Sequence, residues 1–326
     1  MKPSTYCLRR TAIAAVRASD GEKTFFQDFD GQIRETRYED TRGYSGGDKR
    51  SVIGAATHAK YQSPLAAVST EEDRKAVTLF YISKTHRLCG ITFSSHTSRW
   101  SPDTALADLD VPACPSSQLA ATCFDTGSEI RLFYQDPTLT LRELAFDGHC
   151  WDHVADFRLP ALVGSGMASE KWLNDDGTLR EIQFVYQDEK CAVRSHFYLA
   201  DEDKWYQGYL NLADRPPQCG LAIAAHRNLG YGADVCRVYV VEHGGKIVEH
   251  AFYSDTEEWK VEELAPRLLV ESKLAACWWP SRGNPEIRLF YQGVGGELEG
   301  FNFQNRRWWL EHALPCGDDV RGRAKL

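Results

Sequence analysis

Short apolar segments alternate with turn residues along this chain, in a pattern that repeats about every fifty residues. The clearest block is Ile-Arg-Leu-Phe-Tyr-Gln at residues 130–135, which returns unchanged at residues 287–292. A small, mostly alanine-rich segment precedes five of the blocks: residues 13–16, 65–68, 119–122, 223–226 and 274–277. Aligned on their last residue, the blocks end at positions 51 to 55 residues apart: Gln27, Ile82, Gln135, Gln187, Val241 and Gln292. The chain therefore holds six copies of one unit.

Each copy predicts four short β-strands separated by turn residues such as Asp-Pro and Asp-Gly. In the third copy the strands are expected at residues 118–123, 129–135, 140–146 and 151–157. One such unit cannot bury its own apolar faces, so the copies are expected to pack around a common centre, with the small strands innermost. The pattern predicts an all-β fold, a six-bladed β-propeller.

This propeller is expected to form a single domain over residues 1–326. Its blades are predicted at about residues 11–61, 62–115, 116–164, 165–216, 217–271 and 272–316. Residues 1–10 are expected to add a strand that closes the ring.

Composition narrows the classes of partner and compartment. The net charge is -8, and no dense Lys/Arg run occurs outside the short tail at residues 321–325, which argues against nucleic acid as the main partner. The ten cysteines contain no Cys-x-x-Cys motif and are expected to be reduced thiols, in a chain with ample apolar residues for a core.

No stretch resembles a signal peptide or a membrane span, so we expect a protein that is cytoplasmic or released to the cell surface by a non-classical route, without membrane insertion. The terminal tripeptide Ala324-Lys-Leu326 is similar to a peroxisomal address.

Two positions carry the candidate chemistry, because they vary together from copy to copy. In the third copy Arg131, on the second strand, precedes Glu143, on the third strand, by twelve residues. A constant, even offset across a hairpin is expected to place both side chains on one face, roughly opposite each other. The same offset gives the pairs Lys23/Glu35, Thr78/Gly90, Gln183/Ser195, Arg237/Glu249 and Arg288/Gly300. The first, third and fifth copies thus keep a cation and a carboxylate.

An arginine fork and a carboxylate together can hold neighbouring sugar hydroxyls, each of which both donates and accepts a hydrogen bond. An aromatic side chain would cover the apolar face of such a ligand. Each copy has one after its third strand: Tyr44, Trp100, Trp151, Trp205, Trp259 and Trp308. The alternative is that these residues form cross-strand ion pairs and pack one blade on the next.

These residues resemble the fungal fucose-specific lectins of the Aleuria type. The resemblance rests on the Ile-Arg-Leu-Phe-Tyr-Gln-Asp block, on Phe25–Glu35 and on Ser63–Val68, and it extends over about residues 9–315. It implies a six-bladed propeller that binds L-fucose and fucosylated glycans or glycoproteins between adjacent blades, with several pockets, no catalysis, and no metal or other cofactor. It also suggests a homodimer.

In that family each pocket takes Arg and Glu from one blade and Trp from the next. By position, the resemblance implies one pocket of Arg131, Glu143 and Trp205, and another of Arg237, Glu249 and Trp308, with Trp309 as an alternative. A pocket of Lys23, Glu35 and Trp100 is expected to be weaker, because lysine cannot make the bidentate contact. Arg288 and Tyr44 face Gly300 in an incomplete pocket. The Thr78/Gly90 and Gln183/Ser195 positions are expected to be inactive.

Two other functions stay open. A sialidase-like glycoside hydrolase would need Asp boxes at several turns, and only Asn174–Thr178 is similar to one. A scaffold propeller that binds a protein on one face is the second alternative.

One segment, His149-Cys-Trp-Asp-His153, has metal-binding residue types, but a strand would alternate them between its two faces.

Overall fold

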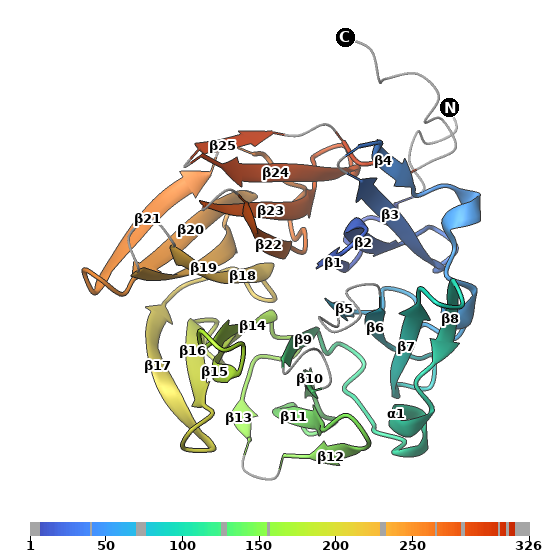
Figure 1. The fold of residues 1–326 in the computed structure, drawn as a ribbon, viewed down its shortest axis with the longest axis horizontal. Helices are drawn as coiled ribbons and strands as arrows, with labels where there is room; N and C mark the ends of the chain where they lie inside the picture. The colour runs from blue at the N-terminus through green and yellow to red at the C-terminus, as the bar shows by residue number, and fades with distance from the viewer. Residues whose placement is uncertain are drawn as a thin grey trace.

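The computed structural model describes residues 7–39, 41–69, 76–124, 129–154, 157–228, 233–264, 266–281, 284–305, 307–310 and 313–316. Within these residues the strands form six antiparallel sheets, each built from consecutive strands of the chain, around one central axis (Figure 1). This is the predicted all-β, six-bladed β-propeller. No helix among the described residues has both the length and the apolar character needed to cross a membrane.

The strands follow one another outward from the centre of each blade. Blade 1 comprises β1 (Ile13–Ala18), β2 (Gly21–Gln27), β3 (Ile33–Glu39) and β4 (Gly43–Gly46), and blade 2 comprises β5 (Leu65–Ser69), β6 (Val77–Ile82), β7 (Leu88–Ser94) and β8 (Arg99–Pro102). Blade 3 comprises β9 (Leu119–Phe124), β10 (Glu129–Gln135), β11 (Thr140–Phe146), β12 (Trp151–His153) and the short β13 (Leu159–Pro160), which pairs with β11.

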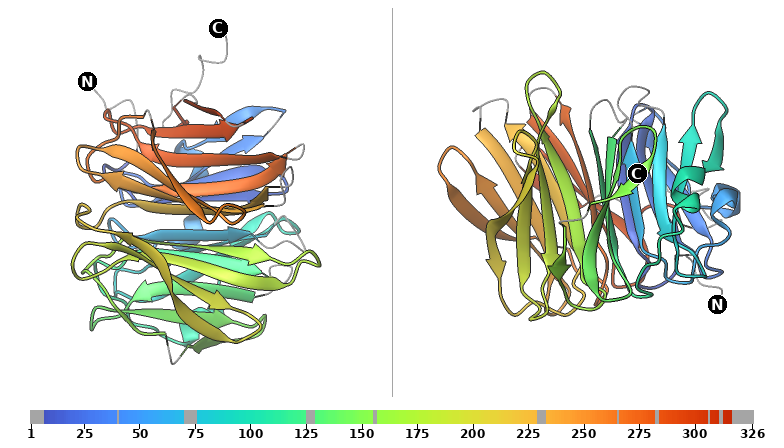
Figure 2. Two further views of the ribbon diagram at one scale, coloured as in Figure 1. Left: turned by 90° about the vertical axis from the view of Figure 1, so that its left-hand side faces the viewer. Right: turned by 90° about the horizontal axis from the view of Figure 1, so that it is seen from below.

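The last three blades have longer strands. Blade 4 comprises β14 (Met167–Leu173), β15 (Leu179–Gln187), β16 (Val193–Leu199) and β17 (Lys204–Leu212). Blade 5 comprises β18 (Leu221–Asn228), β19 (Ala233–Glu242), β20 (Lys246–Tyr253) and β21 (Glu258–Leu264), and blade 6 comprises β22 (Ala275–Ser281), β23 (Asn284–Gln292), β24 (Leu298–Gln304) and β25 (Arg307–Leu310). Edge-on views show the connections between strands gathered at two opposite faces of the ring (Figure 2).

The alanine-rich segments form the inner strands because only small side chains fit where six sheets converge. Each inner strand contacts the inner strand of the next blade, and β22 contacts β1 to complete the circle. Together they line a central channel of about 530 Å³.

The apolar core lies between the blades. The buried apolar side chains of the described residues fall into six clusters, and each cluster joins two neighbouring blades. One face of the second strand packs on one neighbour and the other face on the other neighbour. This explains why strands such as β6 and β2 are buried along their whole length.

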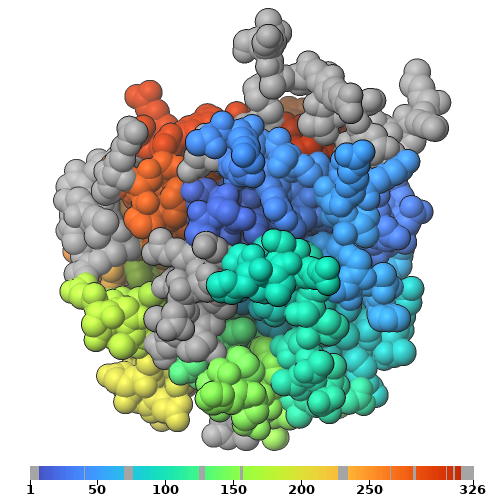
Figure 3. Space-filling model, turned by 45° about the vertical axis from the view of Figure 1, so that its right-hand side comes forward, coloured from blue at the N-terminus to red at the C-terminus, as the bar shows by residue number. Residues whose placement is uncertain are grey.

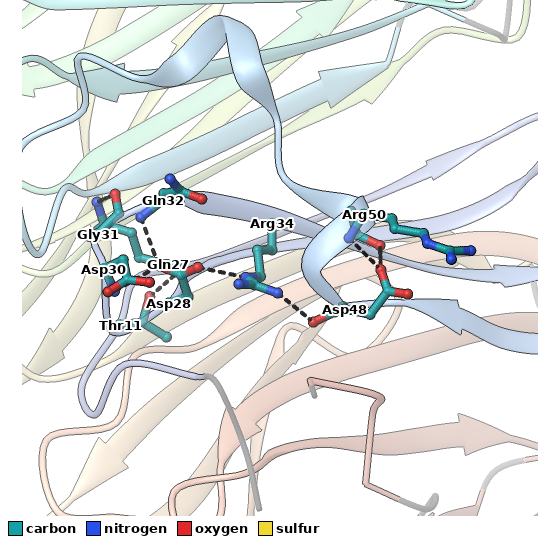
Figure 4. Close-up of polar contacts among 11 residues, drawn as sticks. Thr11, Gln27, Asp28, Asp30, Gly31, Gln32, Arg34, Asp48 and Arg50 are labelled. Atoms are coloured by element: carbon teal, nitrogen blue, oxygen red, sulfur yellow. Dashed lines mark hydrogen bonds and ion pairs between the residues drawn. The ribbon is translucent and has the colours of Figure 1, made fainter. Parts of the chain in front are cut away.

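The repeated Gln-Asp at the end of the second strand is a structural device. Gln27 Nε2 donates to the carbonyl of Gly31 in its own turn and to that of Lys60 in the segment leading to the next blade, at 2.7 Å each. Asp28 accepts from two backbone N–H groups of the turn and from Arg34 Nε at 2.7 Å (Figure 4). Asp136 with Arg142 and Asp188 with Arg194 repeat the ion pair. In these three blades the arginine of the third strand therefore closes the hairpin.

The ring closes between blades 6 and 1, by a route that differs from the predicted strand. Among residues 7–10 only an isolated bridge from Cys7 to Asp28 forms, with Leu8 N donating to Gln27 O, while Gln292 Nε2 donates to Leu8 O. Residues 1–6 lie outside the described part of the chain, as does the tripeptide at 324–326. The C-terminal side adds a contact that was not predicted, because Thr36 Oγ1 donates to Pro315 O at 2.9 Å.

Blade 2 carries a second feature that was not predicted, the short helix α1 (Thr104–Asp108) after its outer strand. Asp103 begins this helix and accepts from Leu106 N. Figure 3 shows the outer surface of blade 2 between the surfaces of blades 1 and 3. All ten cysteines are thiols rather than disulfides, and seven of them are buried.

Candidate functional site

The pocket between blades 3 and 4 brings together the three predicted residues. Arg131 on β10 places Nε 3.1 Å from Oε1 of Glu143 on β11. Trp205, on the outer strand β17 of the next blade, donates from Nε1 to the second carboxylate oxygen at 2.9 Å. The Arg131 guanidinium lies over the Phe124 ring at 5.3 Å. A cation, a carboxylate and aromatic faces therefore converge where two blades meet.

Burial sets the protonation of this carboxylate. The Glu143 side chain is 2% exposed, and burial raises its pKa to about 7, against the opposing effects of Arg131 and of the Trp205 N–H. The Arg131 side chain remains 16% exposed and marks the open side of the pocket.

The pocket between blades 5 and 6 repeats the pair of arginine and glutamate at a shorter distance, without a hydrogen bond from the indole to the carboxylate. Arg237 Nη1 donates to Glu249 Oε1 at 2.6 Å, and the guanidinium lies 4.6 Å over the ring of Phe303 from the next blade. Burial raises the pKa of Glu249, and Arg237 opposes this effect. Trp308 lies in this pocket by an edge-on contact with Tyr239. Of the two candidates from the sequence, Trp308 lies at this junction, whereas Trp309 lies at the junction of blades 6 and 1.

This pocket also contains a residue that sequence reasoning missed. Arg237 Nε donates to Nε2 of His226, on the inner strand β18, at 3.3 Å. His226 occupies the last position of the segment Ile-Ala-Ala-His, where the other copies of that segment have Val, Thr or Cys. The departure from a small or apolar residue was the available signal.

The pocket between blades 1 and 2 departs from the expected pairing. Lys23 and Glu35 are diagonal neighbours on one face, but no ion pair joins them: Lys23 Nζ lies 3.2 Å from Asp20 Oδ2 and 4.7 Å from the centre of the Phe93 ring. Glu35 instead forms an ion pair with Arg37 Nε. Lys23 and Arg37 are direct partners in the β2–β3 register, so the guanidinium enters this pocket from the third strand. The predicted Trp100 does pack here, edge-on to Phe25 at 5.8 Å.

The junction of blades 6 and 1 joins Arg288 to the predicted Tyr44, with Nη1 3.2 Å from the tyrosine hydroxyl oxygen. Gly300 supplies no carboxylate, as expected, but Glu22 on the next blade does: its Oε2 lies 3.0 Å from Arg288 Nη1. The Arg288 guanidinium also stacks on Tyr38 at 3.9 Å. This arginine is therefore paired across the blade boundary rather than within its own hairpin.

The two copies without a cation use the same positions differently. In blade 2 Thr78 Oγ1 lies 3.0 Å from Thr92 Oγ1, and Asp103 Oδ2 accepts from Trp151 Nε1 at 3.0 Å beside Gly90. In blade 4 the Ser195 hydroxyl accepts from Leu210 N at 3.2 Å, where the β16–β17 register shifts. Trp259, the aromatic of the next blade, is 38% exposed.

The aromatic residues share one geometry in four of the junctions. The second-strand aromatic of one blade meets the tryptophan of the next at 5.7 to 5.8 Å between ring centres, with interplanar angles from 85° to 90°: Phe25–Trp100, Phe80–Trp151, Phe133–Trp205 and Tyr239–Trp308. Edge-to-face contacts of this kind stabilise blade packing. These four tryptophans therefore contribute to packing between neighbouring blades.

The strand register refines the predicted relation between cation and carboxylate. Glu143 lies directly opposite Phe133, and Arg131 lies opposite Ala145. The two charged side chains share one face but are diagonal neighbours, not opposite partners. A diagonal separation is within reach of a long arginine side chain.

Within the described ranges no group of three or more His, Cys, Asp and Glu side chains is arranged to hold a metal ion. His149 and Cys150 belong to an exposed turn, in which Asp147 accepts from both of their N–H groups, and the segment Trp151–His153 forms β12.

Fold and pockets together define a repeat β-propeller with polar, aromatic-lined pockets between its blades. The family model described as fungal fucose-specific lectin matches residues 7–315, and the chain belongs to this family.

Among its relatives are two proteins named fucose-specific lectin. The one from Aspergillus fumigatus is 28% identical over 87% of this chain and 88% of its own length. The one from Aleuria aurantia is 26% identical over 91% of both.

Solved structures confirm the fold. The six-bladed propeller of the Aleuria aurantia lectin superposes with a TM-score of 0.81 at 22% identity, covering 98% of this chain and all of the other. The AofleA protein from Arthrobotrys oligospora gives a TM-score of 0.82 at 20% identity, covering 96% of this chain and 89% of the other.

Proposed function

We propose that this chain binds L-fucose and fucosylated glycans in pockets between neighbouring blades, without catalysis. The observation that carries the proposal is the trio of Arg131, Glu143 and Trp205, in which one buried carboxylate bridges the guanidinium at 3.1 Å and the indole at 2.9 Å. The names of the relatives support the choice of sugar.

The chemistry of the trio suits a 6-deoxy sugar. The guanidinium carries five N–H donors, and its contact with Glu143 involves Nε, so the rest of the fork can serve the ring oxygen and a neighbouring hydroxyl of the sugar. The carboxylate accepts from sugar hydroxyls, and the half-buried ring of Trp205 offers apolar surface to the methyl group that fucose carries in place of a hydroxymethyl. In the fifth blade Arg237 and Glu249 offer a cation and a carboxylate, although Arg237 also donates to His226 and Tyr253.

Affinity at one pocket is expected to be modest, because a monosaccharide has few atoms with which to make contacts. Several pockets on one ring raise the avidity for clustered glycans without any new contact. Fucosylated glycoproteins are therefore the proposed partners, and a homodimer would double the number of pockets. Sedimentation velocity tests the dimer.

Absence of catalysis is part of the proposal, because Glu143 and Glu249 each form an ion pair with an arginine of the same hairpin. Release of nitrophenol from a nitrophenyl fucoside would contradict it.

The binding test is titration calorimetry with methyl fucoside. Glu143→Ala removes the acceptor shared by Arg131 and Trp205, and we expect a loss of about 2 kcal/mol or more at that pocket. Ser195→Ala is the matched control: it should leave binding unchanged, although it removes the acceptor for Leu210 N and should cost about 1 kcal/mol of folding free energy. Equal effects of both changes on fucoside binding would refute the assignment of the pocket.

A further inference from the structure

A cavity of about 450 Å³ lies at the junction of blades 6 and 1 and differs in kind from the fucose pockets. Its walls include residues of β22, β23, β24 and β25 and one residue of β3, among them Trp279, Glu286, Arg288, Asn302, Gln304 and Trp309. A volume of this size is typical of small-molecule sites. Both polar and aromatic side chains line the cavity.

The guanidinium of Arg288 is fixed in the wall. The residue is 7% exposed, its Nη1 is 3.0 Å from Glu22 Oε2, and its ring neighbours are Tyr38 at 3.9 Å and Trp279 at 5.4 Å. Because the carboxylate comes from the next blade, the ion pair lies across the junction. A rigid donor fork loses little entropy when a ligand binds.

The polar partner on the third strand of the sixth blade lies two residues further along the strand than in the fucose pockets. There the carboxylate is diagonal to the arginine, but here that position is Gly300. Asn302 lies directly opposite Arg288 and is 6% exposed, and beyond it Gln304 Nε2 donates to Glu286. The side chains that could meet a ligand therefore lie further along the hairpin.

The consecutive residues Trp308 and Trp309 belong to two different sites. Trp308 turns to the fifth blade and meets Tyr239, whereas Trp309 pairs with Asn302 in the β24–β25 register and lines this cavity with 41% of its surface exposed. The corresponding residues in the other outer strands are Ser45, Ser101, Asp152, Tyr206 and Lys260. A solvent-exposed indole beside buried polar groups is an arrangement suited to the apolar face of a sugar ring.

We infer that this cavity binds a neutral, fully hydroxylated pyranose, a hexose, rather than fucose. This inference rests on the proposed function in treating the junctions between blades as saccharide sites. Four polar side chains match a ligand with more hydroxyls than a 6-deoxy sugar. Arg288 and Glu286 are the charged side chains of the walls and sum to zero, and Glu22 pairs with Arg288, so no net positive charge favours sialic or uronic acids.

The experiment starts from a Glu35→Ala, Glu143→Ala, Glu249→Ala protein, in which the three proposed fucose pockets are disabled. Saturation-transfer NMR with the methyl glycosides of mannose, galactose and glucose, and with methyl fucoside, is measured on this protein and on the wild type. We expect at least one hexoside to bind both proteins equally while the fucoside signal is lost from the triple variant.

Trp309→Ala should then weaken hexoside binding about tenfold, as measured by titration. Trp259→Ala is its matched control, because Trp259 is a similarly exposed tryptophan outside the cavity, 38% against 41%. Both substitutions are at the surface, so the fold is retained.

Three results would overturn the inference: no hexoside binds the wild type, Trp309→Ala leaves hexoside binding unchanged, or methyl fucoside competes for the site in the triple variant. Failure of fucose to bind the wild type would reject the proposed function separately, since the hexoside titrations do not depend on it.

Discussion

The junction of blades 2 and 3 and the junction of blades 3 and 4 each contain a tryptophan at the equivalent position, but its surroundings differ. Trp151 and Trp205 meet Phe80 and Phe133 edge-on at nearly equal distances, 5.7 and 5.8 Å. Each indole N–H donates to a carboxylate, Asp103 for Trp151 at 3.0 Å and Glu143 for Trp205 at 2.9 Å. Only the second junction adds an arginine, because Thr78 occupies the position that Arg131 has in blade 3.

The comparison separates packing from binding. A buried indole N–H without an acceptor costs about 1–3 kcal/mol, and at these two junctions both indoles have one. In blade 2 the loss of the glutamate at Gly90 is compensated by Asp103, which comes from the start of α1 and also caps that helix. The tryptophan and its carboxylate thus hold the blades together, and the cation distinguishes a candidate binding pocket.

The largest expected effect comes from removing both complete trios. Glu143→Ala with Glu249→Ala should lower retention on a dense fucose surface by about a hundredfold or more, because avidity depends on pockets that act together. Surface plasmon resonance measures the loss, and circular dichroism checks the fold. Near-wild-type retention by a folded double variant would place binding elsewhere on the molecule.

Asp103→Ala should instead affect folding. The change removes the acceptor for Trp151 Nε1 and the cap of α1, and we expect a loss of about 1–3 kcal/mol in the free energy of unfolding, with fucoside binding unchanged. Urea unfolding and calorimetry give the two quantities. A binding defect without a stability defect would reverse the roles assigned to the two junctions.

The two junctions also differ in how much of their structure the sequence predicts. The six blades and the trio of Arg131, Glu143 and Trp205 were predictable, because the repeat copies each position at a constant offset. Replacements that come from outside the repeat were not. Asp103, which replaces the missing carboxylate of blade 2, lies outside the four-strand repeat, and Glu22, which pairs with Arg288, lies on the neighbouring blade. Arg37, which pairs with Glu35, is on the third strand rather than at the cation position of the second strand. An alignment of the copies therefore does not reveal these charged partners.

Acidification should weaken the pocket of blade 3. Burial raises the pKa of Glu143 to about 7, and the sugar needs the ionised carboxylate as acceptor, so affinity should fall by up to about tenfold for each pH unit below 7. The sign for folding is opposite: a raised carboxyl pKa contributes stability that is present below its unfolded value and is lost as the pH rises through about 7.

Titration of a Glu249→Ala, Glu35→Ala protein with fucoside isolates the Glu143 pocket. The titrations cover about pH 5.5 to 8, roughly one unit or more on either side of the pKa. Glu143→Gln on the same background should give weak, pH-independent binding. A flat profile for the protein that retains Glu143 would mean that the carboxylate is not the acceptor.

The smallest expected effect concerns the source of the guanidinium in blade 1. On the Glu143→Ala, Glu249→Ala background, Arg37→Lys should weaken the remaining fucoside binding about threefold, because lysine cannot replace the fork that is paired with Glu35. The effect is small because the Arg37 side chain is 40% exposed and solvent screens its charge. Lys23→Met is the comparison variant, since Lys23 is paired with Asp20. If Lys23→Met abolishes the residual binding and Arg37→Lys leaves it intact, the cation of this pocket comes from the second strand after all, and blade 1 differs from blade 3 only in the identity of its cation.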